Sequence, residues 1–282
     1  MMRQNMDKLR FGTAGIPLST PQPGTENGIR HARKLGLDAF EVEFVRSINI
    51  TRERAPAVNA AARASDVTLT CHAPYFINLN SDDKAKLEAS VKRILDSARI
   101  AWLCGSWSVT FHAAFYLKMD AGAVYSTVKD RIRSIARALK DEGNPIWLRP
   151  ETTGKRSQFG SLDEILRISQ EVEQVMPCVD FSHLHARSGG GNNSYEEFAG
   201  TLESIEKALG KTGLQNMHIH TSGIEYTDAG ERSHTNLQHS DMRYKELMRA
   251  LRDFRAAGVL ISESPNIEGD ALLMQREFRG KG

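Results

Sequence analysis

Eight short apolar segments alternate with longer amphipathic segments along the 282-residue chain, without an intervening linker. The apolar segments fit strands that are buried on both faces of a parallel sheet, and they cover residues 9–12, 39–44, 67–72, 108–112, 145–151, 176–180, 215–221 and 259–263. The segments between them carry apolar residues at helical spacing, and they cover residues 27–35, 52–64, 82–104, 121–140, 161–175, 195–209, 241–256 and 270–278. This alternation predicts one (β/α)8 TIM barrel over residues 1–282, with residues 1–8 as a frayed N-terminal tail.

Most of the predicted strands end on a histidine or an acidic residue. In chain order these residues are His72, His112, Glu151, Asp180, His218 and Glu263. The carboxyl ends of barrel strands meet at one rim, and functional groups of this fold lie there. We therefore expect the six side chains to converge on one site.

Such a convergence of acidic side chains indicates bound cations. Carboxylates that approach one another away from water are costly unless positive charge neutralises them. A mixture of imidazole and carboxylate ligands favours Zn2+, Mn2+ or Fe2+ over Mg2+ or Ca2+. The ligands exceed what one tetrahedral ion uses, so we expect two or three ions, mainly zinc. Metal ions paired at about 3.5–4 Å commonly hydrolyse phosphate esters.

Short motifs surround these strand ends. They are His72–Ala73–Pro74–Tyr75, Phe111–His112, Pro150–Glu151–Thr152, Asp180–Phe181–Ser182–His183, Met217–His218–Ile219–His220 and Glu263–Ser264–Pro265. In their order and spacing the motifs resemble the endonuclease IV family of zinc-dependent enzymes, in a diverged, archaeal-type form. The resemblance covers nearly the whole barrel. It implies a phosphodiesterase with a trinuclear zinc cluster that cuts double-stranded DNA at abasic sites during base-excision repair.

The resemblance also implies a role for individual residues. The ligands would be His72, His112 and Glu151 for the first ion, Asp180, His218 and Glu263 for the second, and His183, Glu231 and His234 for the third. Glu151 would bridge the first two ions and Glu263 would orient the attacking water, so these two residues would be catalytic. His220 lies on the same strand face as His218, where it would support the ligands or serve the fold.

Four further residues are candidates for binding the substrate. Tyr75 matches a family residue that contacts DNA. Arg46, Lys155 and Arg187 follow strand ends and would ring the active face, where cations contact phosphates. Because the net charge is only +2, attraction to DNA has to come from such local cations.

This sequence differs from the family's pattern at two places. The family has Asp–x–His after strand seven, whereas two residues separate Glu231 from His234 here. Segments 11–15 and 45–49 differ from the family's DNA-handling segments. The sequence therefore leaves open a sugar isomerase or epimerase of the related xylose-isomerase-like barrels, which commonly hold one divalent metal with two Glu, an Asp and a His. A metal-loaded binding protein is a third alternative, which the open rim argues against.

Cysteine usage and hydropathy suggest the cellular context. Cys71, Cys104 and Cys178 are odd in number and far apart, as expected for reduced core residues in the cytosol. No signal peptide is recognised, and the most apolar stretch, residues 100–111, is too short to span a bilayer. We expect a cytoplasmic monomer without a membrane partner.

Overall fold

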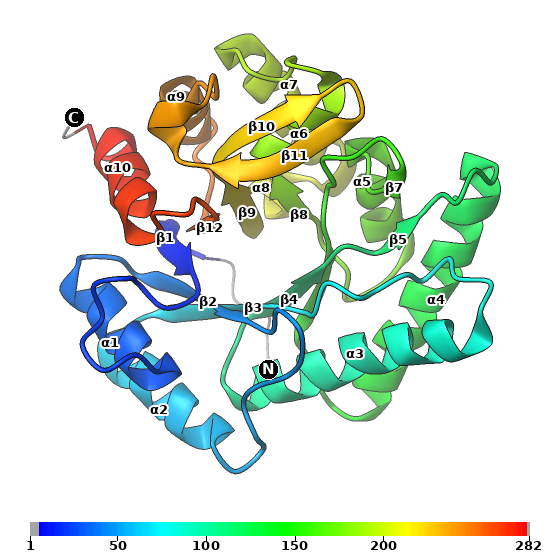
Figure 1. Cartoon of the computed structure of the whole chain (residues 1–282), viewed down its shortest axis with the longest axis horizontal. Helices are drawn as coiled ribbons and strands as arrows, with labels where there is room; N and C mark the ends of the chain where they lie inside the picture. Colours follow the sequence, from blue (N-terminus) through cyan, green and yellow to red (C-terminus); the bar gives the residue numbers. More distant parts are fainter. Residues whose placement is uncertain (1–5, 281–282) are drawn as a thin grey trace.

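The structure is a computed structural model that describes residues 6–280. Eight strands form one parallel sheet: β1 Leu9–Ala14, β2 Ala39–Glu43, β3 Thr68–His72, β4 Ser108–Phe111, β6 Trp147–Pro150, β8 Cys178–Asp180, β9 Met217–Thr221 and β12 Gly258–Ser262. Their order is β6-β4-β3-β2-β1-β12-β9-β8. Parallel bridges from Leu148 to Val175 and from Glu151 to Cys178 join the two edges. The sheet thus closes into the predicted TIM barrel (Figure 1).

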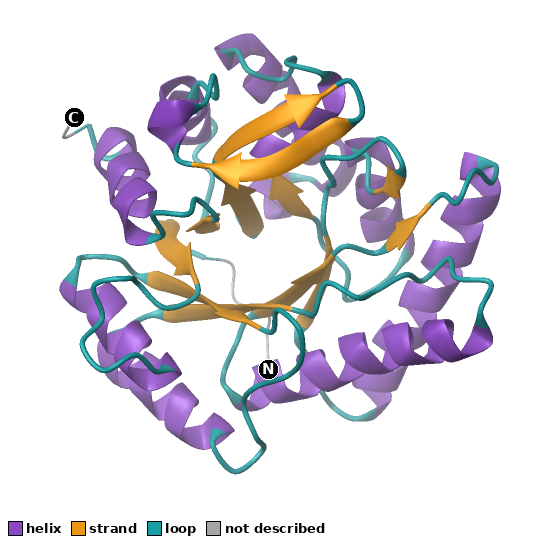
Figure 2. Cartoon of the chain, viewed as in Figure 1, coloured by secondary structure: helices purple, strands orange, loops and turns teal. Residues whose placement is uncertain are grey.

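Helices surround the barrel on the outside (Figure 2). The main helices that follow the barrel strands are α1 Thr25–Lys34, α2 Ala55–Ser65, α3 Lys84–Leu103, α4 Ala121–Asp141, α5 Leu162–Glu171, α7 Tyr195–Leu209, α9 Tyr244–Asp253 and α10 Glu268–Phe278. Several begin at side-chain caps that satisfy free backbone N–H groups. Asp83 caps α3, and capping boxes start α5 at Ser161 and α7 at Ser194.

The structure adds elements that the alternation did not predict. They are the short pair β5 Ala114–Phe115 and β7 Gln158–Phe159, the hairpin β10 Gly223–Thr227 and β11 Gly230–Thr235, and the helical segments α6 Phe181–Ser188, α8 Lys211–Leu214 and η1 Leu237–His239. The β10–β11 hairpin lies over the barrel mouth in Figure 1. Helix α6 begins directly after β8 because Asp180 is its N-cap and accepts the His183 N–H at 2.6 Å.

The barrel interior is unusually polar for a protein core. Side chains alternate between the two faces of a strand, so Arg149 on β6 and Glu151 directly after it share the inner face with His218 and His220 on β9. All four are 0% exposed. Arg149 donates to the carbonyls of Pro177 and Asn216 at 2.7 and 2.8 Å. Buried polar groups need such partners, and the interior therefore carries a column of ionisable groups up to the rim.

Three other predictions concern the chain as a whole. The cysteines Cys71, Cys104 and Cys178 are buried and unpaired, as expected. Among residues 6–280, no helix has both the length and the apolar character needed to cross a bilayer. The predicted frayed tail falls largely on residues 1–5, which lie outside the described residues.

Candidate metal centre

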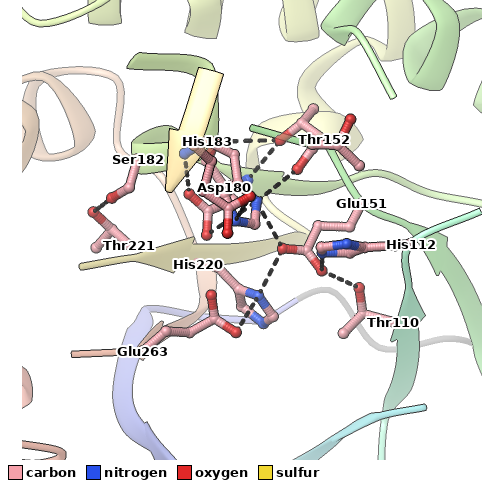
Figure 3. A network of polar contacts seen from close by, with 12 residues as sticks. Thr110, His112, Glu151, Thr152, Asp180, Ser182, His183, His220, Thr221 and Glu263 are labelled. Atoms are coloured by element: carbon pink, nitrogen blue, oxygen red, sulfur yellow. Dashed lines mark hydrogen bonds and ion pairs between the residues drawn. The ribbon is translucent and has the colours of Figure 1, made fainter. Parts of the chain in front are cut away.

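Three groups of ligand-type side chains meet at the rim. They are His72, His112 and Glu151; Glu151, Asp180, His220 and Glu263; and His183, His234 and Glu263. Within each group the ligand atoms lie within 4.8 Å of one another. Glu151 belongs to the first two groups and Glu263 to the last two, so the groups form one connected cluster. Figure 3 shows its centre, with Glu151 between His112, His183 and His220.

Glu151 lies at the centre of this cluster and is fully buried. Its Oε2 is 3.4 Å from Nε2 of both His72 and His112. Its Oε1 is 3.3 Å from His183 Nδ1 and 3.2 Å from His220 Nδ1. The two oxygens thus face different histidines, which is the arrangement that a bridging carboxylate requires.

Backbone carbonyls determine which ring nitrogen of two histidines is left to bind a metal. His72 Nδ1 lies 2.6 Å from Ala73 O and His183 Nδ1 lies 2.9 Å from Thr152 O. A carbonyl accepts only from a protonated nitrogen, so each Nδ1 carries a proton and Nε2 is the nitrogen left to bind a metal. Metal-binding histidines typically use their second nitrogen in this way.

Asp180 gives an independent test of whether these residues fit a metal. Its Oδ1 accepts the His183 N–H as the cap of α6, but its Oδ2 is buried without a hydrogen-bond partner among the described residues. Leaving a buried acceptor unsatisfied costs about 1–3 kcal/mol, and more when it is charged. A cation among Glu151, Asp180, His220 and Glu263 would satisfy this oxygen, so the residues fit a metal ion.

The β10–β11 hairpin brings Glu231 and His234 to the cluster. His183 Nε2 lies 3.2 Å from His234 Nε2 and 3.6 Å from Glu231 Oε2. The hairpin docks on the loop after β6, where Gly154 O accepts the Glu231 N–H at 3.0 Å. A Cβ at Gly154 would lie 2.5 Å from Glu231 Cβ and 3.1 Å from His183 Cδ2. The glycine is therefore required for this close approach.

His218 is the one predicted ligand that the structure separates from the rim. Strand β9 runs to Thr221, so the residue at the rim is His220 rather than His218. His220 Nδ1 lies 3.2 Å from Glu151 Oε1 and 3.3 Å from Glu263 Oε1. His218 lies one step deeper and contacts Glu41 and Ser108 instead. In the structure the group with Glu151, Asp180 and Glu263 therefore contains His220 in the place predicted for His218.

Burial and mutual charge shift the pKa values of these groups strongly. Burial favours neutral His72, yet contact with Glu151 and the charge of Glu43 raise the pKa of His72 to about 10. Burial opposes ionisation of Glu151, but His112 and His220 hold the pKa of its carboxyl well below the usual range. Burial, together with Glu151 and Asp180, raises the pKa of Glu263 well above its usual range. Without cations, protons thus balance the excess of carboxylates.

A pocket of about 520 Å3 opens above the cluster. Among the predicted substrate-binding residues, Tyr75 and Lys155 line it. The Tyr75 ring lies 5.3 Å from the His72 ring, and Tyr75 is 53% exposed. Both residues can therefore meet a ligand that approaches the cluster.

Arg187 and Arg46 do not line this pocket. The Arg187 guanidinium donates to the carbonyls of Lys155 and Gln158 at 2.6 and 3.0 Å, and it also contacts Thr153. These bonds hold the loop after β6 in place, so the structure gives Arg187 a structural role, while its substrate-binding role stays a prediction. Arg46 is exposed on the loop after β2, outside the pocket.

Two acidic residues of β2 were not among the site residues predicted from the sequence. Glu41 and Glu43 alternate with Val42, so both face the barrel interior. Glu43 lines the pocket, and burial raises the pKa of its carboxyl to about 7, against the charge of His72. The sequence contains a pattern that could have identified them. Two acids at alternate positions of an apolar strand share one face, and a strand of this kind is expected to bury both side chains.

Known proteins are similar to this chain in sequence. An uncharacterized protein of Methanocaldococcus jannaschii is 40% identical over 268 residues, 95% of this chain and 96% of that protein. An apurinic-apyrimidinic endonuclease 1 from Plasmodium berghei is 25% identical over 214 residues, 73% of this chain but 41% of that longer protein.

Solved structures show the same fold at low sequence identity. Endonuclease IV from Thermus thermophilus superposes with a TM-score of 0.73 at 22% identity, covering 95% of this chain and 98% of that one. A D-tagatose 3-epimerase-like protein superposes with a TM-score of 0.71 at 18% identity, covering 95% and 96%. The family model described as the xylose isomerase-like TIM barrel matches residues 29–279, and the chain belongs to that family.

Proposed function

We propose that this protein is a metal-dependent phosphodiesterase that cuts the DNA backbone at abasic sites, using two to three ions, mainly zinc. In this proposal the chain acts as a single-domain cytoplasmic monomer. One observation carries it: two histidine pairs, His72 with His112 and His183 with His234, flank a four-ligand group that would already suffice for one metal.

The flanking pairs matter because a one-metal enzyme has no use for them as ligands. Each pair shares a carboxylate with the central group, through Glu151 on one side and Glu263 on the other. His72 and His183 are 3% and 2% exposed. Buried ionisable groups are costly unless they are paired or coordinate metals, and additional metal ions would give these histidines the second of these roles.

Bound zinc would polarise the scissile phosphate, lower the pKa of an attacking water and stabilise the leaving oxygen. Glu151 would be the ligand shared by the first two sites, and Glu263 would accept a hydrogen bond from the attacking water. Lys155, which lines the pocket, contacts a phosphate beside the cut. The exposed ring of Tyr75 packs against the DNA at the abasic site.

A specific observation also favours a second candidate, a sugar isomerase or epimerase. The central group contains two Glu, one Asp and one His, Glu151, Glu263, Asp180 and His220, which is the ligand set expected for a one-metal sugar enzyme. It lies beneath a pocket of about 520 Å3, a size that suits a small ligand. In this alternative one divalent ion binds the central group.

A cleavage assay distinguishes the two candidates. The purified protein, zinc-loaded or treated with chelator, is incubated with a duplex that carries one abasic site and with the matched intact duplex. We expect zinc-dependent nicking of the abasic strand alone. Failure to nick it at low salt, together with turnover of a ketose in the same preparation, would transfer the assignment to the epimerase.

A further inference from the structure

A buried trio lies directly below the metal centre, inside the barrel. Glu41 on β2 places Oε1 2.9 Å from His220 Nε2 and Oε2 3.0 Å from His218 Nε2. The two Nε2 atoms are 3.2 Å apart. All three residues are 0% exposed. The trio therefore has to satisfy its hydrogen-bonding groups internally.

Within this trio His220 faces two different environments. Its Nδ1 points to the rim, near Glu151 and Glu263, and its Nε2 points down to Glu41. A neutral imidazole has one protonated nitrogen and one with a lone pair. His220 can serve as a rim ligand through Nδ1 only if Nε2 carries the proton. The surroundings of Nε2 thus decide whether His220 can bind a metal.

Glu41 supplies the surroundings that select this tautomer. A carboxylate is an acceptor only, so a bare Nε2 lone pair 2.9 Å from its oxygen would be repelled. Among the described residues neither Glu41 oxygen makes a hydrogen bond of regular geometry, and each faces an imidazole nitrogen at ion-pair distance. The imidazoles of His218 and His220 are therefore the groups that compensate its buried charge.

His218 completes the arrangement from the other side. Its Nδ1 lies 3.1 Å from Ser108 Oγ, which can donate to it, and its Nε2 faces the second oxygen of Glu41. Both oxygens of Glu41 are thus engaged, one by each histidine. We propose that Glu41, held by His218, is a positioning residue that keeps His220 in the Nε2–H tautomer and presents Nδ1 to the metal at the rim.

This inference rests on the metal centre of the proposed function, but not on the DNA substrate. It gives His218 a supporting role and His220 the ligand role. It also explains why an acid lies deep in the barrel, below the pocket. Carboxylate partners of ligating histidines typically change metal affinity by about 10- to 100-fold when they are removed.

Zinc affinity of the purified full-length protein, measured by competition with a chromophoric chelator, tests the inference. Glu41→Gln keeps one acceptor oxygen, so we expect about a 10-fold loss of affinity. Glu41→Leu keeps the volume without an acceptor, and we expect a loss of about 100-fold. Nitrogen NMR of the zinc-loaded wild type should show His220 protonated at Nε2 and bound through Nδ1.

Asp38→Asn is the matched control. Asp38 is also a buried acid, next to β2, but it pairs with Lys8 and the Phe11 N–H at the other end of the barrel. We expect it to lower stability while zinc affinity stays unchanged. A structural defect alone would therefore appear in both variants, and the selective loss of zinc would appear only at Glu41.

Several outcomes would overturn the inference. One is zinc affinity within twofold of the wild type in both Glu41 variants, and another is a His220 protonated at Nδ1 in the zinc-loaded protein. His218→Gln should keep the zinc count, so loss of an ion there would instead identify a deep site formed by Cys178, His218 and His220, whose ligand atoms also lie within 4.8 Å. Zinc binding that depends on Glu41, without DNA cleavage, would support the inference while refuting the proposed nuclease.

Discussion

Two regions of the barrel mouth differ in how closely their side chains approach one another. The inner cluster is the set of candidate metal ligands around Glu151, and the outer loops are the segments that carry Arg46, Lys155 and Arg187. In the inner cluster, strand ends bring Glu151 to within 3.4 Å of four histidine nitrogens. In the outer loops, the cations expected to meet DNA are dispersed: Lys155 lines the pocket, whereas Arg187 holds a loop and Arg46 lies outside. The comparison teaches that the scaffold positions the candidate metal ligands more tightly than the cations that would meet a polyanionic substrate.

The largest expected effect comes from the centre of the inner cluster. Glu151→Gln should lower turnover on the order of 1000-fold, about 4 kcal/mol, because an amide cannot carry charge to two cations. Steady-state kinetics on the abasic duplex checks this. Glu225→Gln, on the exposed part of the hairpin, is the control and should behave like the wild type. Activity of Glu151→Gln within about tenfold of the wild type, a loss of only ~1.4 kcal/mol, would refute the bridge.

The next effect tests whether the hairpin belongs to the inner cluster. Gly154→Ala should displace Glu231 and His183 and so remove about one zinc equivalent, with a loss of activity on the order of 10-fold to 100-fold. Metal analysis after gel filtration measures the count.

Gly200→Ala is the matched control for Gly154→Ala. Gly200 lies in α7 with nothing near its added Cβ, so the protein should gain about 0.5–1 kcal/mol of stability and keep its zinc. An unchanged zinc count in Gly154→Ala would exclude the hairpin from the metal centre.

A smaller effect concerns pH. The pKa of His72 is raised from 6.5 to about 10 in the folded, metal-free protein. Its contribution to stability is therefore complete below pH 6.5 and is lost as the pH rises toward 10. Zinc needs neutral histidines, so zinc affinity should rise over the same window. Chemical denaturation with and without zinc should show these opposite slopes, and parallel slopes would contradict the role of His72.

The smallest effect distinguishes the outer cations. Lys155→Ala should flatten the log–log salt dependence of DNA binding by about one unit, because it removes one phosphate contact. Arg46→Ala should leave the slope unchanged, and Arg187→Ala should lower stability through the loop after β6. Fluorescence anisotropy across a salt series measures the slopes. Equal flattening by Lys155→Ala and Arg46→Ala would show that the loops close on DNA.

The sequence predicted the parts of this molecule that depend on strand periodicity. The barrel and the grouping of His72, His112, Glu151, Asp180 and Glu263 follow from apolar strands whose ends share one rim. The position of His220 could not be predicted, because His218 lies on the same strand face and periodicity alone does not decide which of the two reaches the rim.

Other features depend on contacts between distant segments. The role of Arg187 follows from carbonyls about 30 residues away, and the approach of Glu231 depends on Gly154. Periodicity within one segment carries no information about such contacts. These contacts depend on how the loops pack against one another in the folded chain.

Anomalous diffraction at the zinc edge, from crystals of the zinc-loaded protein, tests the central claim most directly. We predict three peaks at the barrel mouth: one among His72, His112 and Glu151, one beside His220 Nδ1, and one between His183 and the hairpin. A single peak in the central group would contradict the multinuclear centre and favour a one-metal sugar enzyme.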